Sequence, residues 1–137
     1  MLQEITVSYT KETLADGRVL CYRFADTTPA TIDAWADDLI HELEIWPNDR
    51  PWRLILDIRL NGSVVSAYAL RRARAIAGMR SELPGRLAIL IGSRLAAQVI
   101  SMALRVAPNS YRRRACFVNE PLAVAWLLEQ DVTSPQS

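Results

Sequence analysis

The chain of 137 residues predicts an α/β domain with a mixed sheet, in the order β-β-α-β-α-β-α-β-α. Segments patterned as strands alternate with segments spaced as helices, and the two central strand-like runs, 52–58 and 86–91, are apolar almost throughout. Such runs are typical of parallel strands covered by helices on both faces. The first two strand-like segments alternate apolar and polar residues instead, which predicts an antiparallel hairpin.

The expected hairpin consists of strands 5–9 and 18–24, joined by a turn at 15–17. A helix follows, because apolar residues then recur at intervals of three and four. Thr28 is its expected N-cap, and Pro47 ends it. The central strand 52–58 comes next.

A second helix is expected over 64–82, where apolar positions again follow helical spacing and the pair 84–85, Pro-Gly, ends the pattern. The strand 86–91 follows. Ser93 is the expected N-cap of a third helix that runs to about Val106.

The chain closes with a strand, 115–118, and a helix that Asn119 caps. The basic run 112–114 is expected to be a solvated turn before that strand. We expect one domain over residues 1–131 and a frayed tail over 132–137, because the length suits a single core and the chain has no linker or repeat.

Composition excludes several classes of function. A formal net charge of +1 gives no general reason to bind nucleic acid or an anionic membrane. No apolar run is long enough to span a bilayer, and the start of the chain lacks a secretion signal, so we expect a cytoplasmic protein. Cys21 and Cys116 lie among apolar residues and are expected in the core, and we expect no metal and no cofactor.

Four segments then point to a family: LILDIR, RLAILIGS, RRACFV and a last helix with AVAWLL. With the initial hairpin they resemble the STAS/SpoIIAA-like family, whose fold is shared with CRAL-TRIO lipid-carrier domains. The likeness runs from about residue 4 to residue 130 and is closest at Ala123-Val124-Ala125-Trp126-Leu127. It implies the SpoIIAA-like fold and a non-enzymatic module that binds other proteins.

STAS regulators present a phosphorylatable serine after the central strand, and the matching stretch here contains Ser63 and Ser66. Neither serine follows an aspartate, as it would in the family's usual motif. Asn61 and Gly62 are typical of a turn, and Ser63 then serves as a helix cap. We therefore do not expect a kinase-dependent switch.

Polar residues follow three of the predicted parallel strands. The carboxyl ends of such strands meet at one edge of the sheet, where open α/β sheets place ligand crevices. A small ligand or an anion held at a helix start is one interpretation, and ordinary capping of strand–helix junctions is the other. The candidates are Asp57, Arg59, Ser63, Ser93, Arg94, Asn119 and Glu120.

The third helix is apolar on more of its surface than one packing face requires. We expect Leu95, Val99, Met102, Ala103 and Val106 to pack on the sheet. A second stripe then needs cover from neighbouring helices, from another molecule or from a ligand. The expected interaction surface is Ala96, Ile100, Met102 and Leu104.

Two functions are open. The favoured one is a protein-interaction module that uses helix 94–106 and forms a homodimer or binds a protein partner. The alternative is a carrier of a small apolar or lipid-like ligand in a pocket lined by that helix. We do not expect an enzyme, since His41 is the only histidine and no nucleophile and base are arranged together.

Overall fold

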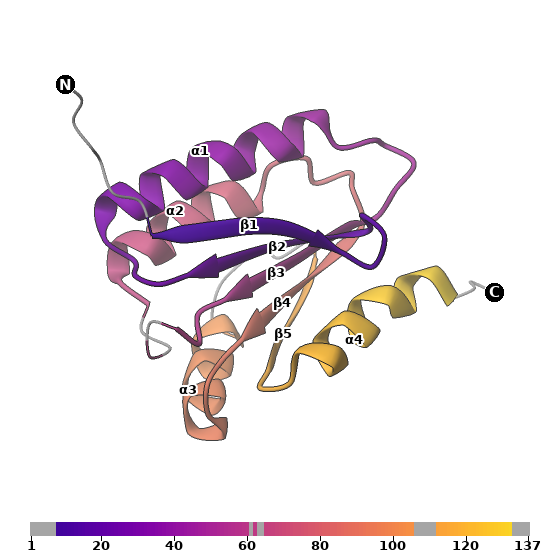
Figure 1. The fold of residues 1–137 in the computed structure, drawn as a ribbon. Coiled ribbons are helices and arrows are strands. Elements are labelled where there is room, and N and C mark those ends of the chain that lie inside the picture. The colour runs from indigo at the N-terminus through magenta and orange to yellow at the C-terminus, as the bar shows by residue number, and fades with distance from the viewer. Residues whose placement is uncertain (1–7, 61, 63–64, 106–111, 133–137) are drawn as a thin grey trace.

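The computed structural model describes residues 8–60, 62, 65–105 and 112–132, without the side chains of 101, 103–105 and 130–132. Within this part of the chain, one five-stranded sheet carries four helices, and its strands stand in chain order (Figure 1). β1 pairs antiparallel with β2 and the other pairs are parallel, which confirms the predicted α/β order and mixed sheet. The elements are β1 (Tyr9–Leu14), β2 (Val19–Phe24), α1 (Pro29–Ile45), β3 (Trp52–Asp57), α2 (Ala67–Ala77), β4 (Gly85–Leu90), α3 (Arg94–Arg105), β5 (Arg113–Phe117) and α4 (Glu120–Val132).

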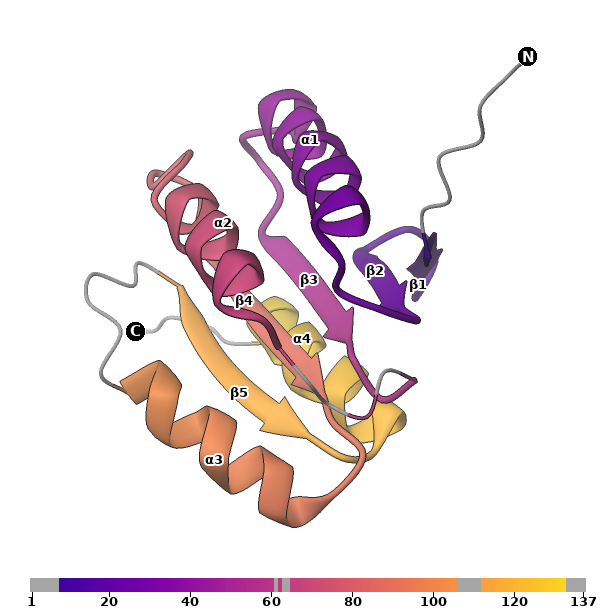
Figure 2. The same cartoon turned by 90° about the vertical axis from the view of Figure 1, so that its left-hand side faces the viewer.

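Helices cover both faces of the sheet. α1, α2 and α3 share one face, over a core that includes Trp35, Leu54 and Ile76. α4 covers the other face, over a smaller core that includes Ile55 and Leu127 (Figure 2). The almost unbroken apolar pattern of β3 and β4 has its physical cause here, because both of their faces are buried. None of the described helices is long and apolar enough to cross a membrane.

The hairpin begins later than the sequence pattern predicts. β1 starts at Tyr9 and runs to Leu14, where the prediction was strand 5–9, and residues 5–7 lie outside the described chain. Its register against β2, from Tyr9 opposite Phe24 to Leu14 opposite Val19, requires the turn to follow at once. The alternation rule missed this strand because β1 is at the sheet edge and four of its six residues are exposed.

The second helix is shorter than predicted. α2 spans Ala67–Ala77, and its N-cap is Ser66, whose hydroxyl accepts a hydrogen bond from the amide of Ala69. Gly78 ends it, well before the Pro-Gly pair that was expected to do so. Gly85 instead begins β4. The position requires glycine, because a Cβ there would meet the carbonyl oxygen of Trp52 at 2.3 Å.

The closing strand and helix are present as predicted, but β5 spans Arg113–Phe117, where the prediction was strand 115–118, and Val118 is exposed. Asn119 caps α4, its side-chain oxygen accepting from the amide of Leu122 at 2.9 Å. Ala123 and Leu127 are fully buried, while the rings of Phe117 and Trp126 pack at 5.5 Å.

The two cysteines differ in burial. Cys21 is completely buried, and that burial raises the pKa of its thiol to about 12, so the thiol stays protonated. Cys116 is only half-buried, against the core under α1, α2 and α3. Neither environment resembles that of a reactive cysteine.

Two helices end on arginine side chains that come from elsewhere in the chain. Arg80 donates to the carbonyls of Leu43 and Trp46 at the end of α1, and Arg112 donates to carbonyls at and beyond the end of α2. On α4, Arg53 and Arg86 donate instead to carbonyls that lie before the last turn, those of Leu127 and Trp126. The last carbonyls of a helix lack intrahelical partners and carry partial negative charge, which a guanidinium satisfies.

These contacts correct the prediction for residues 112–114. The run is not a solvated turn: Arg112 is half-buried, and β5 begins at Arg113. The guanidinium of Arg112 donates to backbone carbonyls just beyond the end of α2. A sequence pattern does not reveal such a contact.

We expect Arg80→Ala to lower the free energy of unfolding by about 2 kcal/mol, because it removes charged donors from the carbonyls of Leu43 and Trp46 at the end of α1. Urea unfolding followed by circular dichroism measures the loss. Arg71→Ala, at an exposed arginine of α2, is the matched control and should cost less than about 0.5 kcal/mol. Equal losses in the two variants would show that the Arg80 contacts do not stabilise α1.

Candidate functional site

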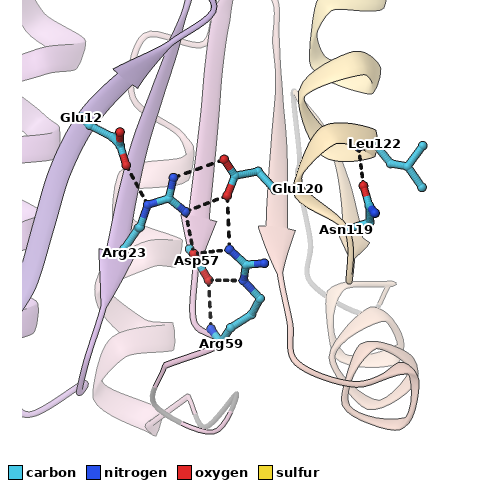
Figure 3. A network of polar contacts seen from close by, with 7 residues as sticks. All are labelled: Glu12, Arg23, Asp57, Arg59, Asn119, Glu120 and Leu122. Carbon is cyan, nitrogen blue, oxygen red and sulfur yellow. Dashed lines mark hydrogen bonds and ion pairs between the residues drawn. The ribbon is translucent and has the colours of Figure 1, made fainter.

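Two of the three predicted groups of polar residues do meet at the carboxyl edge of the sheet. Asp57, the last residue of β3, and Glu120, the first of α4, both contact the guanidinium of Arg59 (Figure 3). Arg23 of β2 bridges the same two carboxylates, at 2.8 Å from each, and also contacts Glu12. We call Glu12, Arg23, Asp57, Arg59 and Glu120 the edge cluster.

The charges of the edge cluster compensate one another. Burial by itself would raise the pKa of Asp57, but hydrogen bonds from Arg59 and Arg23 outweigh it and hold that pKa below its ordinary value. The hydrogen bond from Arg23 likewise lowers the pKa of Glu120. Both carboxyls are therefore ionised and paired at neutral pH, so the cluster ties β2, β3 and α4 together.

The remaining candidates at this edge serve their own helices. The hydroxyl of Ser93 accepts from the amide of Ala96 at the start of α3, and Asn119 caps α4. Arg94 is exposed and has no ion pair among the described residues. Ser63 lies outside the described residues. The strands also never reverse their order, so the edge lacks the switch point where α/β sheets form a crevice.

A cavity of about 410 Å³ lies instead on the face shared by α1, α2 and α3. We call it the groove. β3, β4 and β5 form its floor, α2 and α3 form its walls, and the start of α1 closes one end. Figure 2 shows α2 and α3 on either side of β4 and β5. Its lining residues are Phe24, Thr27, Ile32, Trp35, Leu56, Ile58, Val65, Ala69, Leu70, Ala73, Arg74, Leu87, Ile89, Val99, Ile100 and Arg114.

The groove is apolar except at three residues, Thr27, Arg74 and Arg114. Arg114 stands on β5 beside Leu87, in the row of side chains that faces α1, α2 and α3. A polar donor also lies in the wall: among the described residues, the buried indole N–H of Trp35 has no hydrogen-bond acceptor. An adjoining cavity of about 80 Å³ shares several of these residues and extends the space towards the end of α1.

The structure reverses the predicted faces of α3. Leu95, Val99 and Met102, expected to pack on the sheet, are 72%, 61% and 63% exposed. Ala96 and Ile100, expected to face outward, pack against the core. α3 lies at the sheet edge beside β5, and the small Ala96 lets it approach closely, which leaves the larger side chains outside. Of the predicted interaction surface, Met102 is exposed, and the side chain of Leu104 lies outside the described residues.

Sequence reasoning missed the two arginines that matter most here. Arg23 joins the edge cluster because the β2–β3 register places it opposite Asp57. Arg114 enters the groove because alternate residues of a strand point to opposite faces, so Arg113 and Arg114 cannot both face solvent. That alternation was the available signal for Arg114.

The described residues give little support for a metal site or for a catalytic histidine. Among the described residues, no group of three or more His, Cys, Asp or Glu side chains is placed to hold a metal ion. His41 is exposed on α1. Comparison of the chain with models of protein families, with curated proteins and with solved structures finds no match.

Proposed function

We propose that this protein is a non-enzymatic binding domain for an amphipathic small molecule, with an apolar chain and one carboxylate, held in the groove. The observation that carries the proposal is an apolar cavity of about 410 Å³ with Arg74 and Arg114 in its lining. Sites for small molecules are commonly about 300–1,000 Å³, mostly apolar, with a few polar groups that fix the orientation.

The charged and the apolar residues of the groove recognise different parts of the ligand. A guanidinium binds a carboxylate through charge-assisted hydrogen bonds, and these gain strength where apolar walls exclude water. The floor residues Leu56, Ile58 and Ile89 bury a hydrocarbon chain.

This assignment is the carrier function that the sequence left as an alternative. It keeps to the non-enzymatic binding class that the resemblance to STAS/SpoIIAA-like and CRAL-TRIO proteins implies. A protein-interaction module or homodimer is the second candidate, and the exposed apolar stripe of Leu95, Val99 and Met102 favours it.

We expect the protein to bind dansylundecanoic acid, with fluorescence enhancement, and Arg114→Gln to weaken that binding roughly tenfold through loss of a charge-assisted pair. Dodecanoate should displace the probe much better than dodecanol. The matched control is Arg113→Gln: the adjacent arginine is exposed, lies in the row that faces α4 and lines no part of the groove.

Three results would contradict the proposal. Absence of probe uptake by the wild-type protein would exclude the groove as a binding site. Equal competition by the acid and the alcohol, or equal binding by the two Gln variants, would exclude Arg114 from recognition of the carboxylate. Fluorescence titration with circular dichroism as a folding control distinguishes these results.

A further inference from the structure

The charges of this chain are strongly segregated. Residues 58–119 contain eleven arginines, no lysine and a single acidic residue, Glu82, whereas the rest of the chain is acidic. The segment supplies α2 and α3, so neither of these helices contains an acidic residue. The near-zero net charge of the whole protein therefore averages a basic central segment and acidic flanking segments.

Within this basic segment, exposed arginines occur close in sequence to exposed apolar residues. Arg71 and Arg94 are exposed and form no ion pair among the described residues. On α3, Arg94 directly precedes the stripe of Leu95, Val99 and Met102, and helical periodicity places it at the border of that stripe. We call Leu95, Val99, Met102, Arg71 and Arg94, together with Leu70, the docking face.

Two residues of the docking face lie at the opening of the groove. Leu70 of α2 and Val99 of α3 line the groove and are also 41% and 61% exposed, so they stand at its rim. A ligand that enters between α2 and α3 therefore crosses the docking face. Arginines that border large apolar side chains are typical of surfaces that lie in the headgroup region of an anionic bilayer.

We infer that the docking face binds the surface of an anionic lipid bilayer, from which the groove takes up its amphipathic ligand. The source of the ligand rests on the proposed function, whereas the attachment to the bilayer does not. Charge complementarity selects this occupant, because the two charged residues of the face are arginines without ion pairs among the described residues and its other members are apolar. A second copy of the chain is the occupant that the experiment must exclude.

Co-sedimentation of the full chain with vesicles tests the inference. We expect binding to vesicles of equal parts phosphatidylcholine and phosphatidylglycerol, little binding to phosphatidylcholine alone, and a decline with added salt. Arg94→Gln and Arg71→Gln should each weaken binding roughly fivefold, and Leu95→Asp roughly tenfold. The controls Arg113→Gln and Leu122→Asp change an exposed arginine and an exposed leucine away from the docking face, and they should bind as the wild type does.

Several outcomes would overturn the inference. They are absence of binding to anionic vesicles, equal binding to both compositions, and equal losses in the docking-face variants and their controls. A dimer in light scattering that Leu95→Asp dissociates, without vesicle binding, would assign the face to a second copy. Leu95, Arg71 and Arg94 do not line the groove, so dansylundecanoic acid titration of the same variants separates failure of docking from failure of ligand binding.

Discussion

Asp57→Asn is expected to destabilise the protein by about 3 kcal/mol, at the lower end of the range for breaking a buried ion pair. The Asp57 side chain is only 3% exposed and accepts from Arg23 and from both the side chain and the backbone of Arg59. An amide of the same shape has one acceptor oxygen, and its NH₂ group faces donors. Urea unfolding at neutral pH measures the loss.

The matched control for this prediction is Glu12→Gln. Glu12 contacts Arg23 at 2.7 Å but is 46% exposed, and an exposed pair contributes less than about 1 kcal/mol. If Asp57→Asn cost no more than Glu12→Gln, the edge cluster would not be a structural tie. Arg59 would then return as a candidate for an anion site, together with Arg23.

The pH dependence of stability gives a second readout of the same cluster. The pKa values of Asp57 and Glu120 are lowered in the folded protein. A lowered pKa contributes stability that is present above the unfolded value, roughly pH 4, and is lost as the pH falls through the folded value. The wild type should therefore lose stability below about pH 4. Asp57→Asn should lose less over the same interval.

Most of the fold could be predicted from the sequence, because helix caps and apolar runs in this chain are local patterns that indicate which segments are helices and which are buried strands. Thr28 and Asn119 cap their helices as expected, and the apolar runs of β3 and β4 are buried on both faces. The errors concern elements whose bounds depend on tertiary contacts. β1 is set by its register with β2, and α2 ends at Ala77 although an apolar spacing continues beyond it.

The candidate site was only partly predictable for the same reason. Parallel pairing brings the end of β3 near the start of α4, so the meeting of Asp57 with Glu120 follows from the strand pattern. Arg23 could not be found, because its position opposite Asp57 depends on strand register. On α3, two apolar stripes lie side by side, and periodicity alone does not say which one faces the sheet.

A chain-wide net charge also concealed a local signal. The value of +1 averages a basic central segment with acidic flanks, so it carries no information about how the charges are distributed along the chain. Counting charge by segment would have separated the arginines of α2 and α3 from the carboxylates of α1. The same count, placed on the fold, distinguishes the docking face from the rest of the surface.

We expect Ala73→Leu to weaken binding of dansylundecanoic acid roughly thirtyfold while leaving the protein at least as stable as the wild type. Ala73 lies on α2 and lines both cavities. Leucine there would fill the space of two or three methylene groups of a ligand, and each methylene group that is no longer buried costs about 0.8 kcal/mol of binding free energy. The new methyl groups bury themselves against Leu56 and Leu87, so folding gains what binding loses.

Ala75→Leu makes the same change on an exposed position of the same helix, so it carries the same helix propensity without entering the groove. Probe titration and urea unfolding of both variants distinguish two states of the groove. If the groove is open in solution, Ala73→Leu keeps its stability and binds the probe more weakly. A groove that is closed by its own side chains would be overpacked, and Ala73→Leu would then cost about 1–3 kcal/mol of stability, which would contradict a binding function for this face.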